Sequence, residues 1–302
     1  FGVEPMDSFV LYNGGYKVLN NLVPFKDYWL VTGPLMDYLN AFFFKINGTS
    51  WKSFIIHSSL VNAITSTLIF ILFLQFNLNK NFSLVYTLMF SLLMYPSVGV
   101  PFVDHHATIL VMVSFCLFIL GVKKNDNKYF FLIPLFLILG FLCKQTPTTY
   151  GVIAMFVLGL FYLIKNNNPK KFLFSVFSGV LLSLFFLYFF FLITGIPISN
   201  FLTQYIFFAS SIGDYRLANW NFDLSGTIHE YKFIIVPLIY IFYLTYLHYK
   251  QKNKEDFIIL LSLIFFTFLI LFHQILTMNE NYIFFIIPII TAFIHIYSKE
   301  NK

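Results

Sequence analysis

The fold is decided by residues 172–194, FLFSVFSGVLLSLFFLYFFFLIT, which contain no charged side chain. A helix rises about 1.5 Å per residue, so this stretch is long enough to cross the roughly 30 Å hydrocarbon core of a bilayer. The whole chain of 302 residues is similar: 59% of it is hydrophobic, 11% is charged, and 43 Phe residues stand against 13 Asp and Glu residues. A water-soluble surface needs more charge. The composition therefore excludes a soluble globular enzyme and predicts a membrane protein.

Comparable apolar stretches alternate with polar connectors along the chain. They predict nine membrane-spanning helices, near residues 53–75, 82–97, 105–122, 129–143, 149–164, 172–194, 233–249, 256–276 and 281–297. The expected fold class is an all-α polytopic membrane protein, with an outer segment 1–52, a helix bundle 53–302 and a long outer loop at about 195–231. The chain begins with Phe1, and segment 1–52 falls on the outer side, so we expect an earlier span in the parent protein.

The lysines predict the orientation, because cytoplasmic connectors accumulate Lys and Arg. Twelve lie on alternate connectors of one side: Lys80, Lys123, Lys124, Lys128, Lys165, Lys170, Lys171, Lys250, Lys252, Lys254, Lys299 and Lys302. The other side holds the remaining seven basic residues and nine of the thirteen acids. That side is expected to face outward, to the periplasm or a lumen, and the expected location is a bacterial inner membrane with the active site facing the periplasm. The net charge of +6 includes a single arginine and is spread thinly, so it does not indicate a nucleic-acid partner.

Segment 1–52 carries too many charges to span a membrane, but it is patterned. After Asp7, which is placed as a helix N-cap, apolar residues recur at helical spacing: Phe9, Tyr12, Tyr16 and Leu19. Gly33 breaks the chain, Pro34 suits a first turn, and a second helix ends near Gly48. Its predicted apolar stripe consists of Leu35, Tyr38, Leu39, Phe42 and Phe43. We expect two amphipathic helices lying on the membrane surface.

The order of these features resembles the first outer loop of GT-C glycosyltransferases, and more narrowly the branch that includes protein O-mannosyltransferases and lipid A aminoarabinose transferases. The resemblance rests on Asp7, Gly14-Gly15, Pro24-Phe25-Lys26-Asp27-Tyr28 and Gly33-Pro34-Leu35. It implies a sugar donor carried on polyprenyl phosphate, and it implies that Asp7 is the catalytic or acceptor-binding acid. The implied partners are this donor, a lipid, glycan or protein acceptor, and membrane lipids. Ser8 stands where the mannosyltransferases have a second acid.

The chemistry of such a transfer suits a single carboxylate. The acceptor hydroxyl or amine loses a proton as it attacks the anomeric carbon, and a carboxylate such as Asp7 can accept that proton. Inversion then needs one base and a phosphate leaving group. The alternative role of Asp7 is helix capping alone.

Two clusters at outer ends of spans could bind the donor. Asp104, His105 and His106 could bind its phosphate or sugar, or, as weaker candidates, a divalent metal; the alternative is that Asp104 caps the helix after it. The sequence requires no cofactor. Lys144, followed by Gln145, could pair with the lipid phosphate and stabilise the leaving group, or it could be a snorkelling anchor.

Further candidates are weaker. Asp27, Tyr28 and Gln145 are expected to bind the substrate. Arg216 could grip phosphate with two hydrogen bonds, or pair with Asp214 or Asp223. Two histidines inside apolar runs, His57 and His273, would add polar walls to the same cavity if they face inward; the alternative is that each is a hydrogen-bonded core histidine. A helical pattern at residues 201–208 could belong to a lid or to a plain connector.

The leading prediction is therefore a membrane glycosyltransferase. The alternative from another class is a transporter or flippase for a lipid-linked or small polar solute. Transporters place polar groups near the bilayer midplane, often beside broken helices. Here the ionisable groups cluster at one face, which favours the enzyme.

Overall fold

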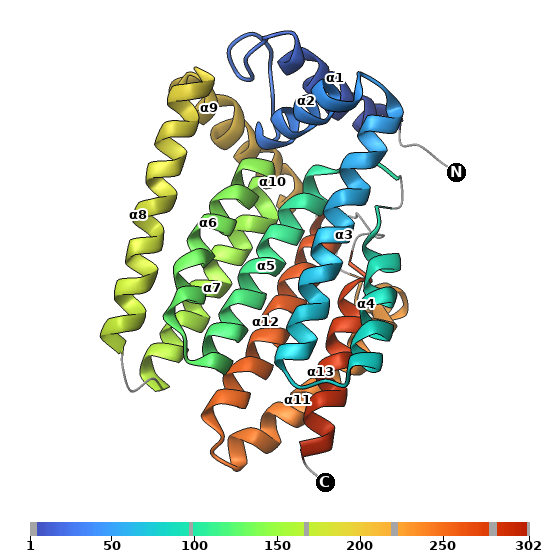
Figure 1. The fold of residues 1–302 in the computed structure, drawn as a ribbon, viewed down its shortest axis with the longest axis vertical. Helices are drawn as coiled ribbons and strands as arrows, with labels where there is room; N and C mark the ends of the chain where they lie inside the picture. The colour runs from blue at the N-terminus through green and yellow to red at the C-terminus, as the bar shows by residue number, and fades with distance from the viewer. Residues whose placement is uncertain (1–4, 97–98, 166–168, 219–222, 278–282, 301–302) are drawn as a thin grey trace.

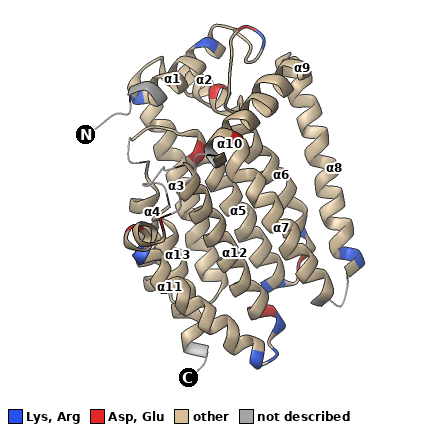
Figure 2. Cartoon of the chain, turned by 180° about the vertical axis from the view of Figure 1, so that it is seen from behind, with Lys and Arg blue, Asp and Glu red and all other residues tan. Residues whose placement is uncertain are grey.

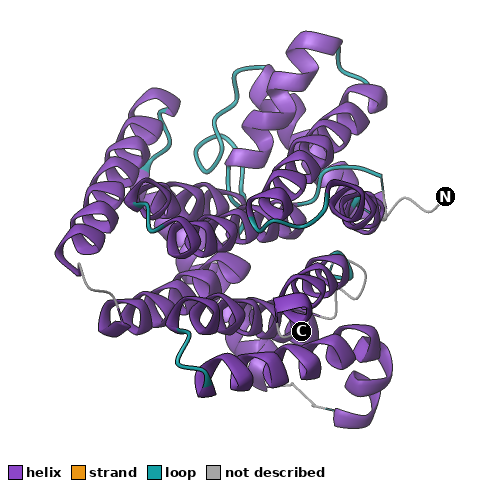
Figure 3. Cartoon of the chain, turned by 60° about the horizontal axis from the view of Figure 1, so that its bottom comes forward, coloured by secondary structure: helices purple, strands orange, loops and turns teal. Residues whose placement is uncertain are grey.

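The computed structural model describes residues 5–96, 99–165, 169–218, 223–277 and 283–300. Within these ranges every regular element is a helix, and one isolated β-bridge joins Pro24 and Tyr28. Figure 3 shows this arrangement of helices and connecting loops. The all-helical part of the fold prediction is confirmed.

The predicted spans all correspond to helices of one bundle (Figure 1). Their bounds are α3 Trp51–Gln75, α4 Lys80–Met94, α5 Val103–Lys124, α6 Asn127–Cys143, α7 Gln145–Lys165, α8 Pro169–Thr194, α11 Leu224–Lys250, α12 Lys254–Thr277 and α13 Ile286–Glu300. Of the described helices, six are long and apolar enough to cross a membrane: α3, α5, α7, α8, α11 and α12. The remaining three, α4, α6 and α13, are shorter. The structure therefore supports a polytopic membrane protein with six candidate spans, fewer than the nine predicted.

Burial distinguishes the centre of the bundle from its edge. In the most apolar windows of α5 and α12, 78% and 72% of the residues are buried, whereas in that of α8 the share is 11%. Helix α8 lies along one side of the bundle in Figure 1, and most of its side chains face away from the protein. Such a surface of Phe and Leu is stable in hydrocarbon and unstable in water.

Two helices, α1 (Pro5–Leu19) and α2 (Leu35–Asn47), form a layer across one end of the bundle (Figure 1). They pack closely at Gly14, where an added Cβ would come within 2.2 Å of a carboxylate oxygen of Asp37. The two predicted helices are thus present. However, Asp7 is not the N-cap, because α1 begins at Pro5 and Asp7 lies in its first turn; the Asp7 side chain lies outside the described part of the structure.

The apolar stripe predicted for α2 is only partly the face that packs on the protein. The buried residues are Met36, Asp37, Asn40, Ala41, Phe43 and Phe44. Phe42 is 56% exposed, and Ile46 is 62% exposed. An apolar side chain at a membrane surface can face lipid, so it need not be the side chain that packs. Two polar residues are buried instead, and both have hydrogen-bond partners.

The connector after α8 returns to the α1–α2 layer through three short helical segments: α9 Ile198–Phe201, the π-helix η1 Leu202–Phe207 and α10 Phe208–Ala218. The Gln204 side chain holds the first loop there. Its Oε1 accepts from Leu30 N at 3.0 Å, and its Nε2 donates to the carbonyl oxygen of Phe25 at 3.1 Å. Asn200 donates to the same Phe25 oxygen at 2.9 Å. The helix predicted around residues 201–208 is present and is docked on the loop.

Candidate active site

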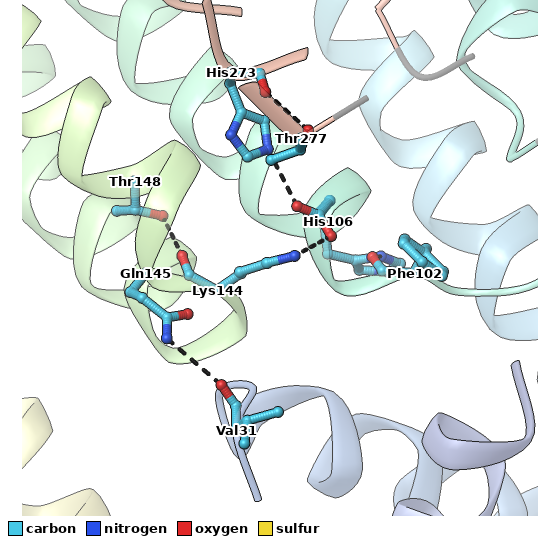
Figure 4. A network of polar contacts seen from close by, with 9 residues as sticks. Val31, Phe102, His106, Lys144, Gln145, Thr148, His273 and Thr277 are labelled. Atoms are coloured by element: carbon cyan, nitrogen blue, oxygen red, sulfur yellow. Dashed lines mark hydrogen bonds and ion pairs between the residues drawn. The ribbon is translucent and has the colours of Figure 1, made fainter. Parts of the chain in front are cut away.

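A buried carboxylate at the α1–α2 end of the bundle joins three helices. Asp104 lies in the first turn of α5, Lys144 follows the last residue of α6, and His273 lies near the end of α12. Lys144 Nζ donates to Asp104 Oδ2 at 2.5 Å, and His273 Nε2 lies 3.1 Å from Asp104 Oδ1. In Figure 4 the dashed lines from Lys144 and from His273 end on one carboxylate, which has no label there and which these two contacts identify as that of Asp104. Since each oxygen already has a partner, Asp104 orients Lys144 and His273 and is poorly placed to accept a proton from substrate.

Within this trio, only Lys144 can reach a ligand without rearrangement. Asp104 is 2% exposed and His273 is 1% exposed, whereas the Lys144 side chain is 21% exposed. Removing one partner of a buried ion pair typically costs about 3–5 kcal/mol, because the other charge is left uncompensated. The ammonium group is therefore fixed in place at the edge of the bundle. Asp104 does not cap α5, since the N-cap residue is Phe102.

The two histidines after Asp104 point elsewhere. His105 Nε2 lies 2.5 Å from the carbonyl oxygen of Met94, and His106 Nδ1 lies 3.0 Å from that of Phe102. Within the described ranges, no group of three His, Cys, Asp or Glu side chains is placed to hold a metal ion. The predicted metal set of Asp104, His105 and His106 does not converge, because consecutive residues of a helix project about 100° apart.

A second polar line connects the α1–α2 layer to the bundle. Asn40 of α2 donates through Nδ2 to the carbonyl oxygen of Leu11 at 3.2 Å, and its Oδ1 lies 2.7 Å from His57 Nδ1. The His57 ring lies 5.0 Å from the His106 ring, centroid to centroid. His57 and His273 therefore both contact α5, but at different residues: His57 contacts His106, and His273 contacts Asp104.

The first loop crosses directly over the end of α6, beside Lys144. Gly33 N donates to the Cys143 carbonyl oxygen at 2.8 Å, and a Cβ on Gly33 would lie 1.9 Å from the Leu142 oxygen. Gln145 donates through Nε2 to the carbonyl oxygens of Tyr205, at 3.0 Å, and Val31, at 3.5 Å. Gly33 is thus needed for close approach as well as for the predicted chain break. The Gln145 amide nitrogen holds the two loops together.

The other first-loop candidates have local partners. Asp27 is exposed, and its Oδ2 accepts from Val23 N at 2.7 Å, which closes a turn. The Tyr28 hydroxyl donates to Asp37 Oδ2 at 2.7 Å, and Lys17 Nζ lies 4.5 Å from the centre of the Tyr28 ring. These contacts fix the loop between α1 and α2.

Asp37 is a buried acid of this site that the sequence pattern alone does not single out. It is 1% exposed. Burial raises its pKa from the ordinary 3.8 to about 7, against the smaller lowering effects of the Tyr28 hydrogen bond and of Lys17. The sequence signal for a buried acid here is its position: Asp37 stands between Met36 and Tyr38 in the first turn of an amphipathic helix.

Two predicted site residues are placed only by their backbone. Arg216 lies in α10, but its side chain, like that of Asp7, is outside the described part of the structure. Asp223, one of its two predicted partners, caps α11 by accepting from Ser225 N at 3.0 Å.

The comparison with protein families gives one match, over residues 31–193, to the family described as dolichyl-phosphate-mannose-protein mannosyltransferase. It spans more than half of the chain and includes Gly33, Asp104 and Lys144, but it begins after Asp7 and ends before His273. Of the residues on which the resemblance rests, the match includes Gly33, Pro34 and Leu35, and from there it extends well into the bundle. No curated protein and no solved structure gives a significant match. The chain belongs to the dolichyl-phosphate-mannose-protein mannosyltransferase family of membrane glycosyltransferases.

Proposed function

We propose that the protein transfers a sugar from a polyprenyl-phosphate donor to an acceptor at the α1–α2 end of the bundle, on the periplasmic face. The observation that carries this proposal is the cluster around Lys144: a fixed ammonium group beside the first loop, inside the segment that matches the family. A lipid-linked donor suits this protein, because six of its described helices are long and apolar enough to cross the bilayer in which the polyprenyl chain of the donor lies.

Lys144 is the proposed ligand of the donor phosphate. An ammonium group has three donors, and Asp104 takes one of them, which leaves two for phosphate oxygens. As the glycosidic bond breaks, negative charge grows on the phosphate, and a fixed cation stabilises that charge more than it stabilises the bound donor. Asp104 and His273 act as positioning residues, since they hold the amine.

Asp7 remains the proposed base. It lies in the first turn of α1, which is bonded to α2 through Leu11 and Asn40, and Asn40 in turn contacts His57 of the bundle. The carboxylate would accept the proton of the acceptor as its oxygen or nitrogen attacks the anomeric carbon, and the polyprenyl phosphate would leave. One base and one leaving group give inversion.

The test is to incubate the purified protein with labelled polyprenyl-phosphate sugars and to extract the products by phase. Lys144→Met should weaken donor binding roughly 10- to 100-fold, the range expected for one charge-assisted hydrogen bond. Lys52→Met is the matched control, because Lys52 is an exposed lysine in the first turn of α3, at the same end.

Lys144→Met leaves the buried Asp104 carboxylate with one partner fewer, which can destabilise the fold. A loss of donor binding by this variant must therefore be distinguished from a loss of folding. The double variant Lys144→Met/Asp104→Asn removes both charges and should recover thermal stability but not donor affinity. If the double variant binds donor as well as the wild type, Lys144 does not hold the phosphate. If no labelled sugar is transferred from any donor, the proposed function is wrong.

A further inference from the structure

A basic cleft lies at the opposite end of the bundle from Lys144, where α6 and α8 begin. Its volume is about 700 Å³. Three lysines line it, Lys128, Lys170 and Lys171, together with three apolar side chains, Phe131, Leu132 and Phe174. Figure 2 shows basic residues at this lower end of α8. Neither the proposed transfer nor the family match gives this cleft a role.

The part of the chain that the structure describes provides no counterion for the three lysines. Among the described residues, no carboxylate forms an ion pair with Lys128, Lys170 or Lys171, whereas nearby Lys123 pairs with Glu255 at 3.1 Å. The acid closest in sequence, Asp126, accepts a hydrogen bond from the backbone N of Lys128 and caps α6. Three exposed cations in one cleft create a positive potential that attracts an anion.

The backbone adds to this potential. Helices α6 and α8 run side by side in the same direction, since the single helix α7 connects them. Ser175 Oγ donates to the Asn127 carbonyl oxygen at 2.5 Å, and a Cβ on Gly179 would come within 2.2 Å of the Phe131 oxygen. Ser175 lies in the second turn of α8, so the N-terminus of α6 lies beside that turn, and it adds about half a positive charge to this wall of the cleft.

Part of the remaining wall is apolar, beside the polar residues Asn127, Ser175 and Ser178. Phe174 is 73% exposed, and Phe131 and Leu132 lie about one turn along α6 from Lys128. A free inorganic anion gains nothing from such a wall. A lipid gains from both parts of the cleft, because its phosphate meets the cations while an acyl chain follows the rings.

We propose that this cleft binds an anionic phospholipid, with the headgroup phosphate between Lys128, Lys170 and Lys171 and an acyl chain along Phe131, Leu132 and Phe174. The lysine distribution places this end of the bundle at the cytoplasmic leaflet, where basic clefts between helices bind anionic headgroups. The site is separate from the proposed transfer chemistry and does not depend on it.

The test uses the full chain in nanodiscs made of equal parts phosphatidylglycerol and phosphatidylcholine, released into the gas phase for native mass spectrometry. The wild type should retain phosphatidylglycerol in preference to phosphatidylcholine. Each lysine near an anionic lipid surface contributes about 1 kcal/mol of binding, which is a factor of roughly five in affinity. The variant Lys128→Gln/Lys170→Gln/Lys171→Gln removes three such factors, so it should lower the preference for phosphatidylglycerol over phosphatidylcholine about 100-fold.

The control is Lys250→Gln/Lys252→Gln/Lys254→Gln, which removes the same charge from exposed lysines on a connector at the same end. It should retain the wild-type preference. Equal losses in both triple variants would show a general charge effect and overturn the proposal. Displacement of the lipid by millimolar inorganic phosphate would show a simple anion site, which would also overturn it.

Discussion

Asp37→Asn tests how the α1–α2 layer is held. The Asp37 carboxyl is 1% exposed, accepts a hydrogen bond from Tyr28 and lies against Gly14. Burial raises its pKa from 3.8 to about 7 in the folded protein. Between about pH 4 and pH 7 the folded layer therefore holds a proton that the unfolded chain has released. The stabilisation by this group is complete below about pH 4 and is lost as the pH rises through about 7.

The size of the effect follows from the shift. A difference of roughly three pKa units corresponds to about 4 kcal/mol at about 1.4 kcal/mol per unit, which is an upper limit for the loss between pH 4 and pH 8. Asparagine has nearly the same shape and cannot ionise, and its amide oxygen can still accept the Tyr28 hydroxyl. We expect Asp37→Asn to be at least as stable as the wild type at pH 8, with a nearly flat dependence on pH.

Hydrogen exchange is the suitable assay, because it reports the layer separately from the bundle. Protection of residues 35–47, corrected for the intrinsic exchange rate, should fall between pH 5 and pH 8 in the wild type and should change little in Asp37→Asn. Asp27→Asn is the control, since Asp27 is exposed on the same loop. If Asp37→Asn keeps the wild-type slope, or if protection of the wild type rises with pH, then burial of Asp37 does not govern the layer.

Three other predictions concern the reaction, the loop and the topology. Asp7→Asn should insert and melt normally yet transfer sugar at least about 100-fold more slowly, because general-base assistance is worth 10²- to 10⁴-fold; near-normal turnover in a well-folded variant would exclude Asp7 as the base. Gly33→Ala should lower the melting temperature and increase proteolysis of the first loop, since its Cβ would overlap the Leu142 oxygen. The control is Gly48→Ala, at a position with positive φ but open space around the Cβ, which should leave the first loop docked. Single cysteines at 123–128, 165–171 and 250–255 should not react with an impermeant reagent in intact cells, and labelling there would reverse the orientation.

The helices could be predicted from sequence because each has one dominant physical cause. An uncharged run such as 172–194 has few stable states other than a helix in lipid, where backbone groups must bond within the segment. The packing face of α2 could not be predicted in the same way. A pattern of apolar residues does not distinguish a side chain that faces lipid, such as Phe42, from one that packs on protein, such as Phe44.

The site was partly predictable for a related reason. The topology places Asp104 and Lys144 at the same end of the bundle, so their proximity could be expected. Their pairing, and the contact with His273 across 169 residues of sequence, depends on helix rotation and on the order of helices around the bundle. Neither quantity is encoded in hydropathy.

Three other acids at this end of the bundle, Asp104, Asp37 and Asp27, already have partners that argue against each of them as the base. Asp104 has Lys144 and His273 on its two oxygens, and a new proton there would break the pair that fixes Lys144. Asp37 lies between Tyr28 and Gly14, where an acceptor has no room to enter. Asp27 closes its own turn at the surface of the loop.

A base must meet the acceptor on the side of the anomeric carbon away from the phosphate, so it cannot be the carboxylate that holds the phosphate ligand. With Asp27, Asp37 and Asp104 each engaged elsewhere, Asp7 stays the proposed base, and Asp7→Asn is the variant that tests it.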